Sequence, residues 1–175
     1  SRWTRIVLNR GNENMENLLK DYQIAHIGFV VENREKAMAR LSELYDIQEW
    51  QMVEWRPSKY IYRGQEYKDP YVKIAISLPN TGTRIEVLEP QTPGLQMDVL
   101  KGGTQTINHI CHVVRDFDKA LQTFLDAGCE LVLETEYTDE IRGFRRCHYV
   151  YDKALNSYIE IAEIPYFRNE KGARL

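Results

Sequence analysis

Two histidines and two glutamates occupy matching places in the two halves of this sequence. The segment around His26, residues 24–31, shares five of eight positions with the segment around His109, residues 107–114, at an offset of 83 (109 − 26). Glu86 and Glu160 lie in similar apolar segments at an offset of 74 (160 − 86). Two matches in the same order indicate an internal repeat that carries one imidazole and one carboxylate per copy.

Each glutamate alternates with β-branched neighbours, so each is expected to point into an apolar interior. An isolated carboxylate there is costly and must be protonated, paired or bound to a cation. One such residue alone is better explained as a satisfied core group, whereas the duplicated set predicts a divalent metal site formed by His26, Glu86, His109 and Glu160. Two imidazoles and two carboxylates without sulfur suit Ni²⁺, Co²⁺, Mn²⁺, Fe²⁺ or Zn²⁺, with two octahedral positions left for water or substrate. The second acids of these segments, Glu89 and Glu163, fall on the opposite face and are expected to be solvated or ion-paired.

The elements that must hold these residues follow the order β-α-β-β-β in each copy. Apolar, β-branched strands are predicted near 23–31, 48–55, 71–78 and 83–89, and again near 106–114, 130–137, 144–151 and 157–163. Helical spacing of apolar residues predicts helices over 33–45 and after Asp116, a natural N-cap, with Gly128 just past the second helix. One amphipathic helix covers one face of each set of strands, which leaves the other face for the sister module and a ligand.

This pattern divides the chain into five parts. Residues 1–21 are an N-terminal extension, 22–90 the first βαβββ module, 91–105 a linker, 106–165 the second module and 166–175 a polar tail expected to fray.

Composition excludes several classes of protein. The net charge is −3, from 23 basic and 26 acidic residues, which argues against a nucleic-acid partner, and no apolar run is long enough to span a membrane. The three cysteines form no C-x-x-C pair, and the first twenty residues contain no signal peptide pattern, so a cytoplasmic protein is expected.

The repeated module and its four polar residues resemble the vicinal oxygen chelate superfamily of glyoxalases, bleomycin-resistance proteins and extradiol dioxygenases. The resemblance covers about residues 22–165. Within the superfamily, the Ile-Glu-Val-Leu-Glu-Pro segment at 85–90 and the passage from 107 to 136 are most similar to methylmalonyl-CoA epimerase. The resemblance implies an α+β fold in which tandem βαβββ modules form a curved, partly open eight-stranded mixed sheet around a metal-binding cavity, and a homodimer.

The resemblance also implies a chemistry. One divalent metal ion chelates a carbonyl or thioester substrate and stabilises the enolate that forms when a neighbouring C–H loses its proton, as in an isomerase, epimerase or lyase. Glu160 is the expected base, and Glu86 is expected to assist from the opposite face.

One position departs from the epimerase pattern. Those relatives carry a second glutamate in a Val-Glu-Ile context, and the matching stretch here reads Val72-Lys73-Ile74. Lys73 is therefore a candidate catalytic base or a ligand for a substrate carboxylate, with an ordinary surface lysine as the alternative.

Substrate contacts are expected from two further groups. Six aromatic residues between 50 and 71, among them Trp55 and Tyr62, are candidates for a wall or lid over the cavity. Alternation puts Arg146 and His148 on one face of their strand, where they are candidates for meeting an anionic group.

Three other functions remain open. A glyoxalase I-like lyase shares the ligand pattern, an Fe²⁺ extradiol-type dioxygenase uses only two histidines and one carboxylate, and a metal-free binding or resistance protein has no need of all four ligands.

Overall fold

The computed structural model describes residues 23–79, 82–103, 106–169 and 173–174. The predicted N-terminal extension, residues 1–21, lies outside the described residues. The first copy of the repeat contains β1 (Ile24–Val30), α2 (Arg34–Tyr45), β2 (Glu49–Trp55), β5 (Val72–Leu78) and β6 (Arg84–Pro90). The second contains β7 (Thr106–Val114), α4 (Phe117–Asp126), β8 (Glu130–Asp139), β9 (Gly143–Asp152) and β10 (Ser157–Glu163). The predicted β-α-β-β-β order is thus confirmed for both copies.

Both long helices begin where the sequence supplies a cap. The side chains of Asn33 and Asp116 accept hydrogen bonds from the amides of Lys36 and Lys119, at 2.8 and 3.2 Å. Such caps satisfy amide groups that have no partner inside the helix. As expected, Gly128 follows α4 in a left-handed conformation, with φ of 91°.

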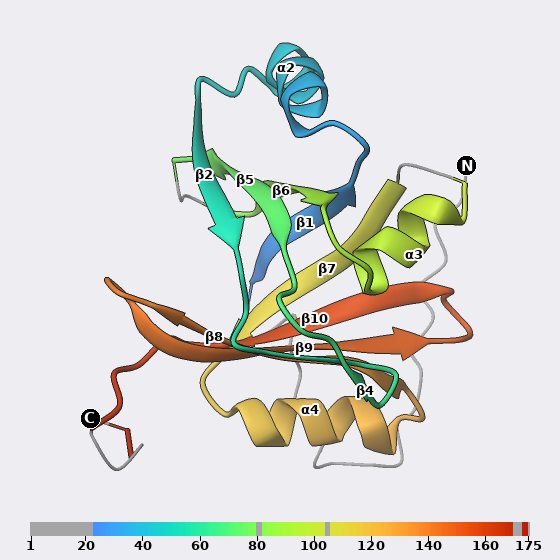
Figure 1. Cartoon of the computed structure of the whole chain (residues 1–175), viewed down its shortest axis with the longest axis vertical. Coiled ribbons are helices and arrows are strands. Elements are labelled where there is room, and N and C mark those ends of the chain that lie inside the picture. Colours follow the sequence, from blue (N-terminus) through green and yellow to red (C-terminus); the bar gives the residue numbers. More distant parts are fainter. Residues whose placement is uncertain (1–22, 80–81, 104–105, 170–172, 175) are drawn as a thin grey trace, which may run out of the picture.

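A single curled sheet joins the two copies (Figure 1). Its strand order is β2-β5-β6-β1-β7-β10-β9-β8-β3-β4, so the antiparallel pair β1 and β7 lies at the junction between two equivalent four-stranded halves. Helices α2 and α4 pack on the outer face of the sheet, over apolar clusters that include Val87 and Leu41 on one side and Phe117 and Ile161 on the other. The inner face encloses the cavity.

The sheet has ten strands where eight are expected. The additional strands are β3 (Lys59–Tyr62) and β4 (Gln65–Glu66), which follow β2 along the chain but lie at the opposite edge of the sheet, where β3 pairs with β8 and β4 pairs with β3. Residues 56–58 therefore cross from the first module to the second. The sequence did not predict β3 or β4, because strands of four and two residues are too short to show a clear alternation of apolar and polar residues.

Two further differences concern the segments after each module. The predicted linker contains a short helix, α3 (Leu95–Lys101). The tail is less frayed than expected where it is described, because Tyr166 exchanges two backbone hydrogen bonds with Phe144, at 2.8 and 2.9 Å. Within the described residues, no helix has the length and apolar character needed to cross a membrane.

Candidate metal centre

Strand register brings the four predicted ligands to the inner face of the sheet. In the parallel pair of β1 and β6, Gly28 lies beside Glu86, and across the β1–β7 junction Gly28 lies beside His109. His26 is beside Cys111, which is in turn beside Glu160. Neighbouring residues across adjacent strands share a face, so all four side chains point into the same cavity.

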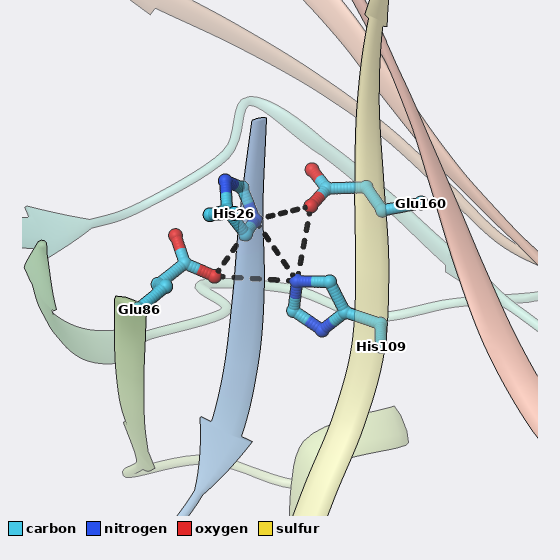
Figure 2. A group of neighbouring side chains, drawn as sticks. All are labelled: His26, Glu86, His109 and Glu160. Carbon is cyan, nitrogen blue, oxygen red and sulfur yellow. Dashed lines mark hydrogen bonds and ion pairs between the residues drawn. The ribbon is translucent and has the colours of Figure 1, made fainter. Parts of the chain in front are cut away.

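The four side chains converge on one point (Figure 2). The two Nε2 atoms of His26 and His109 are 3.0 Å apart. Oε2 of Glu160 is 3.0 Å from His26 Nε2 and 3.1 Å from His109 Nε2, and Oε2 of Glu86 is 3.3 and 3.4 Å from the same two atoms. All four residues are buried.

These distances fit a shared cation. Ligand atoms bound to one ion at about 2.1 Å lie roughly 3.0–3.4 Å apart when they occupy adjacent octahedral or tetrahedral positions. The donor set is also suitable, since imidazole and carboxylate together favour borderline divalent ions. The structure therefore contains a possible four-residue metal-binding group, built from both modules of one chain.

A second layer of contacts orients His109. Its Nδ1 lies 2.9 Å from Oδ1 of Asn108, an acceptor that favours a proton on Nδ1 and leaves the Nε2 lone pair toward the cluster. The ring of Tyr149 meets the His109 ring edge-on at 5.0 Å. Gly28 gives the imidazole its space, because a Cβ at position 28 would lie 2.1 Å from Cε1 of His109.

The acids and imidazoles perturb one another strongly. Burial raises the pKa of the Glu86 carboxyl, but the adjacent His26 and His109 outweigh it and lower that pKa to about 2. Glu160 behaves in the same way, and its pKa is held well below the ordinary value. Burial lowers the pKa of both histidines, yet neighbouring acidic groups raise each above its usual range. Both carboxylates are thus held in the ionised form, which is the form in which a carboxylate binds a cation.

The cavity around this cluster has a volume of about 100 Å³. Apolar walls come from Val53, Trp55, Ile74, Ile76 and Leu88, and polar lining comes from Tyr137, Cys147, Tyr149 and three arginines, Arg84, Arg142 and Arg145. Burial lowers the pKa of the Arg84 guanidinium, and the neighbouring Arg142 and Arg145 act in the same direction. Trp55 is thus the one predicted aromatic contact that lines the cavity, while Tyr62 is buried in the adjacent apolar core.

Lys73 does not reach the cavity, which corrects its expected role. Its neighbours on β5, Val72 and Ile74, are buried, and Ile74 points inward, so alternation turns Lys73 to the outer face. There its Nζ lies 3.4 Å from Oε1 of Glu89. The alternative, a lysine at the protein surface, describes it better, and the expected ion pairing of Glu89 is confirmed.

Arg146 and His148 also lie on the outer face, contrary to the expected substrate contacts. Arg146 donates to Glu163 at 2.9 Å and pairs with Asp118 at the start of α4. His148 packs edge-on against Phe117, with 4.8 Å between ring centroids. This also confirms the expected pairing of Glu163.

The register between β9 and β10 shows which face of β9 meets the cavity. Glu160 lies directly beside Tyr149 on β9, so the inward residues of that strand are odd-numbered: Tyr149, Cys147 and Arg145. Recognising this required the β9–β10 register, which alternation within a single strand does not supply. Arg84 lies two residues before Glu86 on β6, so alternation along that one strand places both side chains on the same face. The sequence alone could therefore have predicted Arg84 as a residue of the cavity.

Comparisons with known proteins agree with this architecture. The family model described as the glyoxalase/bleomycin resistance protein/dioxygenase superfamily matches residues 25–148. Among curated proteins, no sequence matches.

Several solved structures share the fold. A hypothetical protein from Bacillus halodurans C-125 has 17% identity and a TM-score of 0.57, and the match covers 86% of this chain and 99% of that one. Methylmalonyl-CoA epimerase from Mycobacterium tuberculosis has 18% identity and a TM-score of 0.55, with 81% and 87% covered. A variant of the Streptomyces coelicolor methylmalonyl-CoA epimerase, in complex with 2-nitronate-propionyl-CoA, has 14% identity and a TM-score of 0.59, with 81% and 96% covered.

Proposed function

Because the chain belongs to the glyoxalase/bleomycin resistance protein/dioxygenase superfamily, we propose that it is a divalent-metal-dependent isomerase or epimerase, or a related lyase, that removes a proton next to a carbonyl. The observation that carries this proposal is the convergence of His26, Glu86, His109 and Glu160 within one buried cavity. The epimerase neighbours support a thioester substrate of the methylmalonyl-CoA type.

His26, Glu86, His109 and Glu160 would hold the ion. When bound, the ion supplies a Lewis acid that polarises a carbonyl oxygen and stabilises the negative charge that develops there. His109 keeps a fixed orientation, since Asn108 and the Tyr149 ring both contact its imidazole.

Glu160 is the proposed base. Its carboxylate is ionised, buried and attached to the inner face of β10, so it can take a proton from a carbon held in the cavity and return it. Glu86 lies on the other side of the two imidazoles (Figure 2), where it could return a proton to the opposite face of the same carbon. Such an exchange between faces is what an epimerase requires.

The size of the cavity limits what can enter. About 100 Å³ accommodates a small acyl group but not a nucleotide-bearing carrier. If the substrate is a thioester, the carrier must lie outside while the acyl portion reaches the cluster. Apolar walls from Trp55 and Ile76 would exclude water from the reacting carbon.

Deuterium exchange tests this proposal. Metal-loaded protein, purified without a chelating tag, is incubated in D₂O with thioesters, ketoses and hemithioacetals. We expect deuterium at the carbon next to the carbonyl of at least one compound, and a rate about 10²–10⁴-fold lower in Glu160→Gln. Glu43→Gln, which changes an exposed acid on α2, is the matched control.

Several outcomes would contradict it. Absence of bound metal by elemental analysis, with no exchange in the whole panel, would support a binding or resistance protein. Oxygen consumption with catechols would support the dioxygenase. The homodimer and the cytoplasmic location stay predictions, which size-exclusion chromatography with light scattering and fractionation can test.

A further inference from the structure

Three arginines line the cavity close to one another. Arg84 begins β6, Arg145 lies near the start of β9, and Arg142 is in the turn before it. Arg142 pairs with Asp139 at 3.7 Å. Among the described residues, Arg84 and Arg145 form no ion pair, and the Nε atoms of both are buried without a hydrogen-bond partner.

Such an arrangement is unfavourable in the protein alone. The positive charges of Arg142 and Arg145 repel that of Arg84. A buried donor without an acceptor adds a desolvation cost, and a guanidinium has five donors in a fixed fork. Tyr137 lies beside Arg145 on the neighbouring strand and lines the same cavity.

The charges of the cavity point to an anionic occupant. Oε2 of Glu86 and Oε2 of Glu160 both lie within 3.4 Å of the two histidine Nε2 atoms, and among the described residues neither carboxylate forms an ion pair with an arginine. Arg84 and Arg145 therefore line the same cavity with guanidinium groups that pair with no acid of the described residues. An oxyanion that accepts from both guanidinium groups would satisfy their free donors.

We propose that Arg84 and Arg145, with Tyr137 and Arg142 beside them, form an anion subsite that binds a carboxylate or phosphate group of the substrate. The inference rests on the proposed function, which it narrows: the substrate is a small carbonyl compound that carries an oxyanion in addition to the reacting group. Arginine is suited to this task because its planar fork binds carboxylate and phosphate through two parallel hydrogen bonds.

The subsite also fixes the orientation of the bound substrate in the cavity. Arg84 lies beside His26 on the neighbouring strand and two residues before Glu86 on its own strand. An oxyanion held there fixes one end of the molecule, so that the rest extends toward the cluster. Positioning of this kind accounts for part of the rate of many enzymes.

Amide chemical-shift titration of the full chain tests the subsite. The protein is first treated with a chelator so that no metal binds the ligands. Malonate and inorganic phosphate are the probes, and malonamide, which has the shape of malonate without its charge, is the uncharged control. We expect saturable binding of at least one anion, with shifts around β6 and β9, and no binding of malonamide; the tighter anion identifies carboxylate or phosphate as the preferred group.

Variants assign the binding to the arginines. Arg145→Gln and Arg84→Gln are expected to weaken anion binding about 10–100-fold, Arg145→Lys less, and Arg40→Gln, an exposed arginine on α2, not at all. Amide spectra of each variant show whether it is folded. If Arg145→Gln does not fold, Arg145→Lys still tests the role of Arg145. Equal binding of malonamide, no binding of either anion, or unchanged affinity in the folded variants would overturn the inference. Because no metal or turnover is involved, failure of the proposed catalysis would not change this result.

Discussion

The imidazole of His109 reaches the cluster because residue 28 is a glycine and has no Cβ in that space. Gly28 faces the cavity from β1, and a Cβ there would overlap the His109 ring at 2.1 Å from Cε1. Contacts that orient a metal-binding histidine matter for affinity because they fix the lone pair in the direction of the ion.

Gly28→Ala is therefore expected to weaken binding of a divalent ion such as Mn²⁺ or Co²⁺ about 10–100-fold, measured by isothermal titration calorimetry. The backbone at Gly28 has no left-handed conformation, so the strand itself should tolerate alanine. Gly102→Ala, at the end of α3 and away from the cluster, is the control. Wild-type affinity in Gly28→Ala would mean that the imidazole does not need this space.

At the scale of elements, the packing of α4 against β9 buries His148 and so predicts how the free energy of unfolding depends on pH. Burial lowers the pKa of His148 to about 4, with Arg146 and Lys59 acting in the same direction and Asp118 and Glu163 opposing them. In the unfolded chain the pKa of histidine is about 6.5. Between these values the unfolded state binds more protons than the folded state, so the free energy of unfolding falls as pH decreases.

We expect the wild-type protein to lose on the order of 1–3 kcal/mol of stability from this group between pH 7 and pH 4. His148→Phe keeps a ring against Phe117 and removes the titrating group, so its loss over the same range should be smaller. Urea unfolding at several pH values measures the difference. Parallel pH curves for the two proteins would show that His148 does not carry this dependence.

Strand β9 shows which features of the structure could be predicted from the sequence and which could not. Alternation predicted β9 and grouped Arg146 with His148 correctly, but it could not tell which face met the cavity, because both faces of this strand are buried. His26, Glu86, His109 and Glu160 were found because the repeat tied each residue to a partner. The pairing of β3 with β8 joins residues more than 70 positions apart, and no local pattern encodes such a contact.

At the scale of the whole molecule, the cluster links the two modules. His26 and Glu86 come from the first copy of the repeat, and His109 and Glu160 from the second, so one ion bound to all four would connect both halves of the sheet. An ion that binds only the folded chain stabilises it by RT ln(1 + [L]/Kd), about 2.7 kcal/mol at 100 times the dissociation constant.

Addition of Mn²⁺ or Co²⁺ to chelator-treated protein is accordingly expected to raise the melting temperature by roughly 5–10 °C for a chain of this size, measured by calorimetry. Glu86→Gln should reduce the increase, because the weaker amide ligand lowers affinity for the ion. Glu43→Gln alters an exposed acid and should keep the full increase. An equal increase in both variants would locate ion binding elsewhere in the chain.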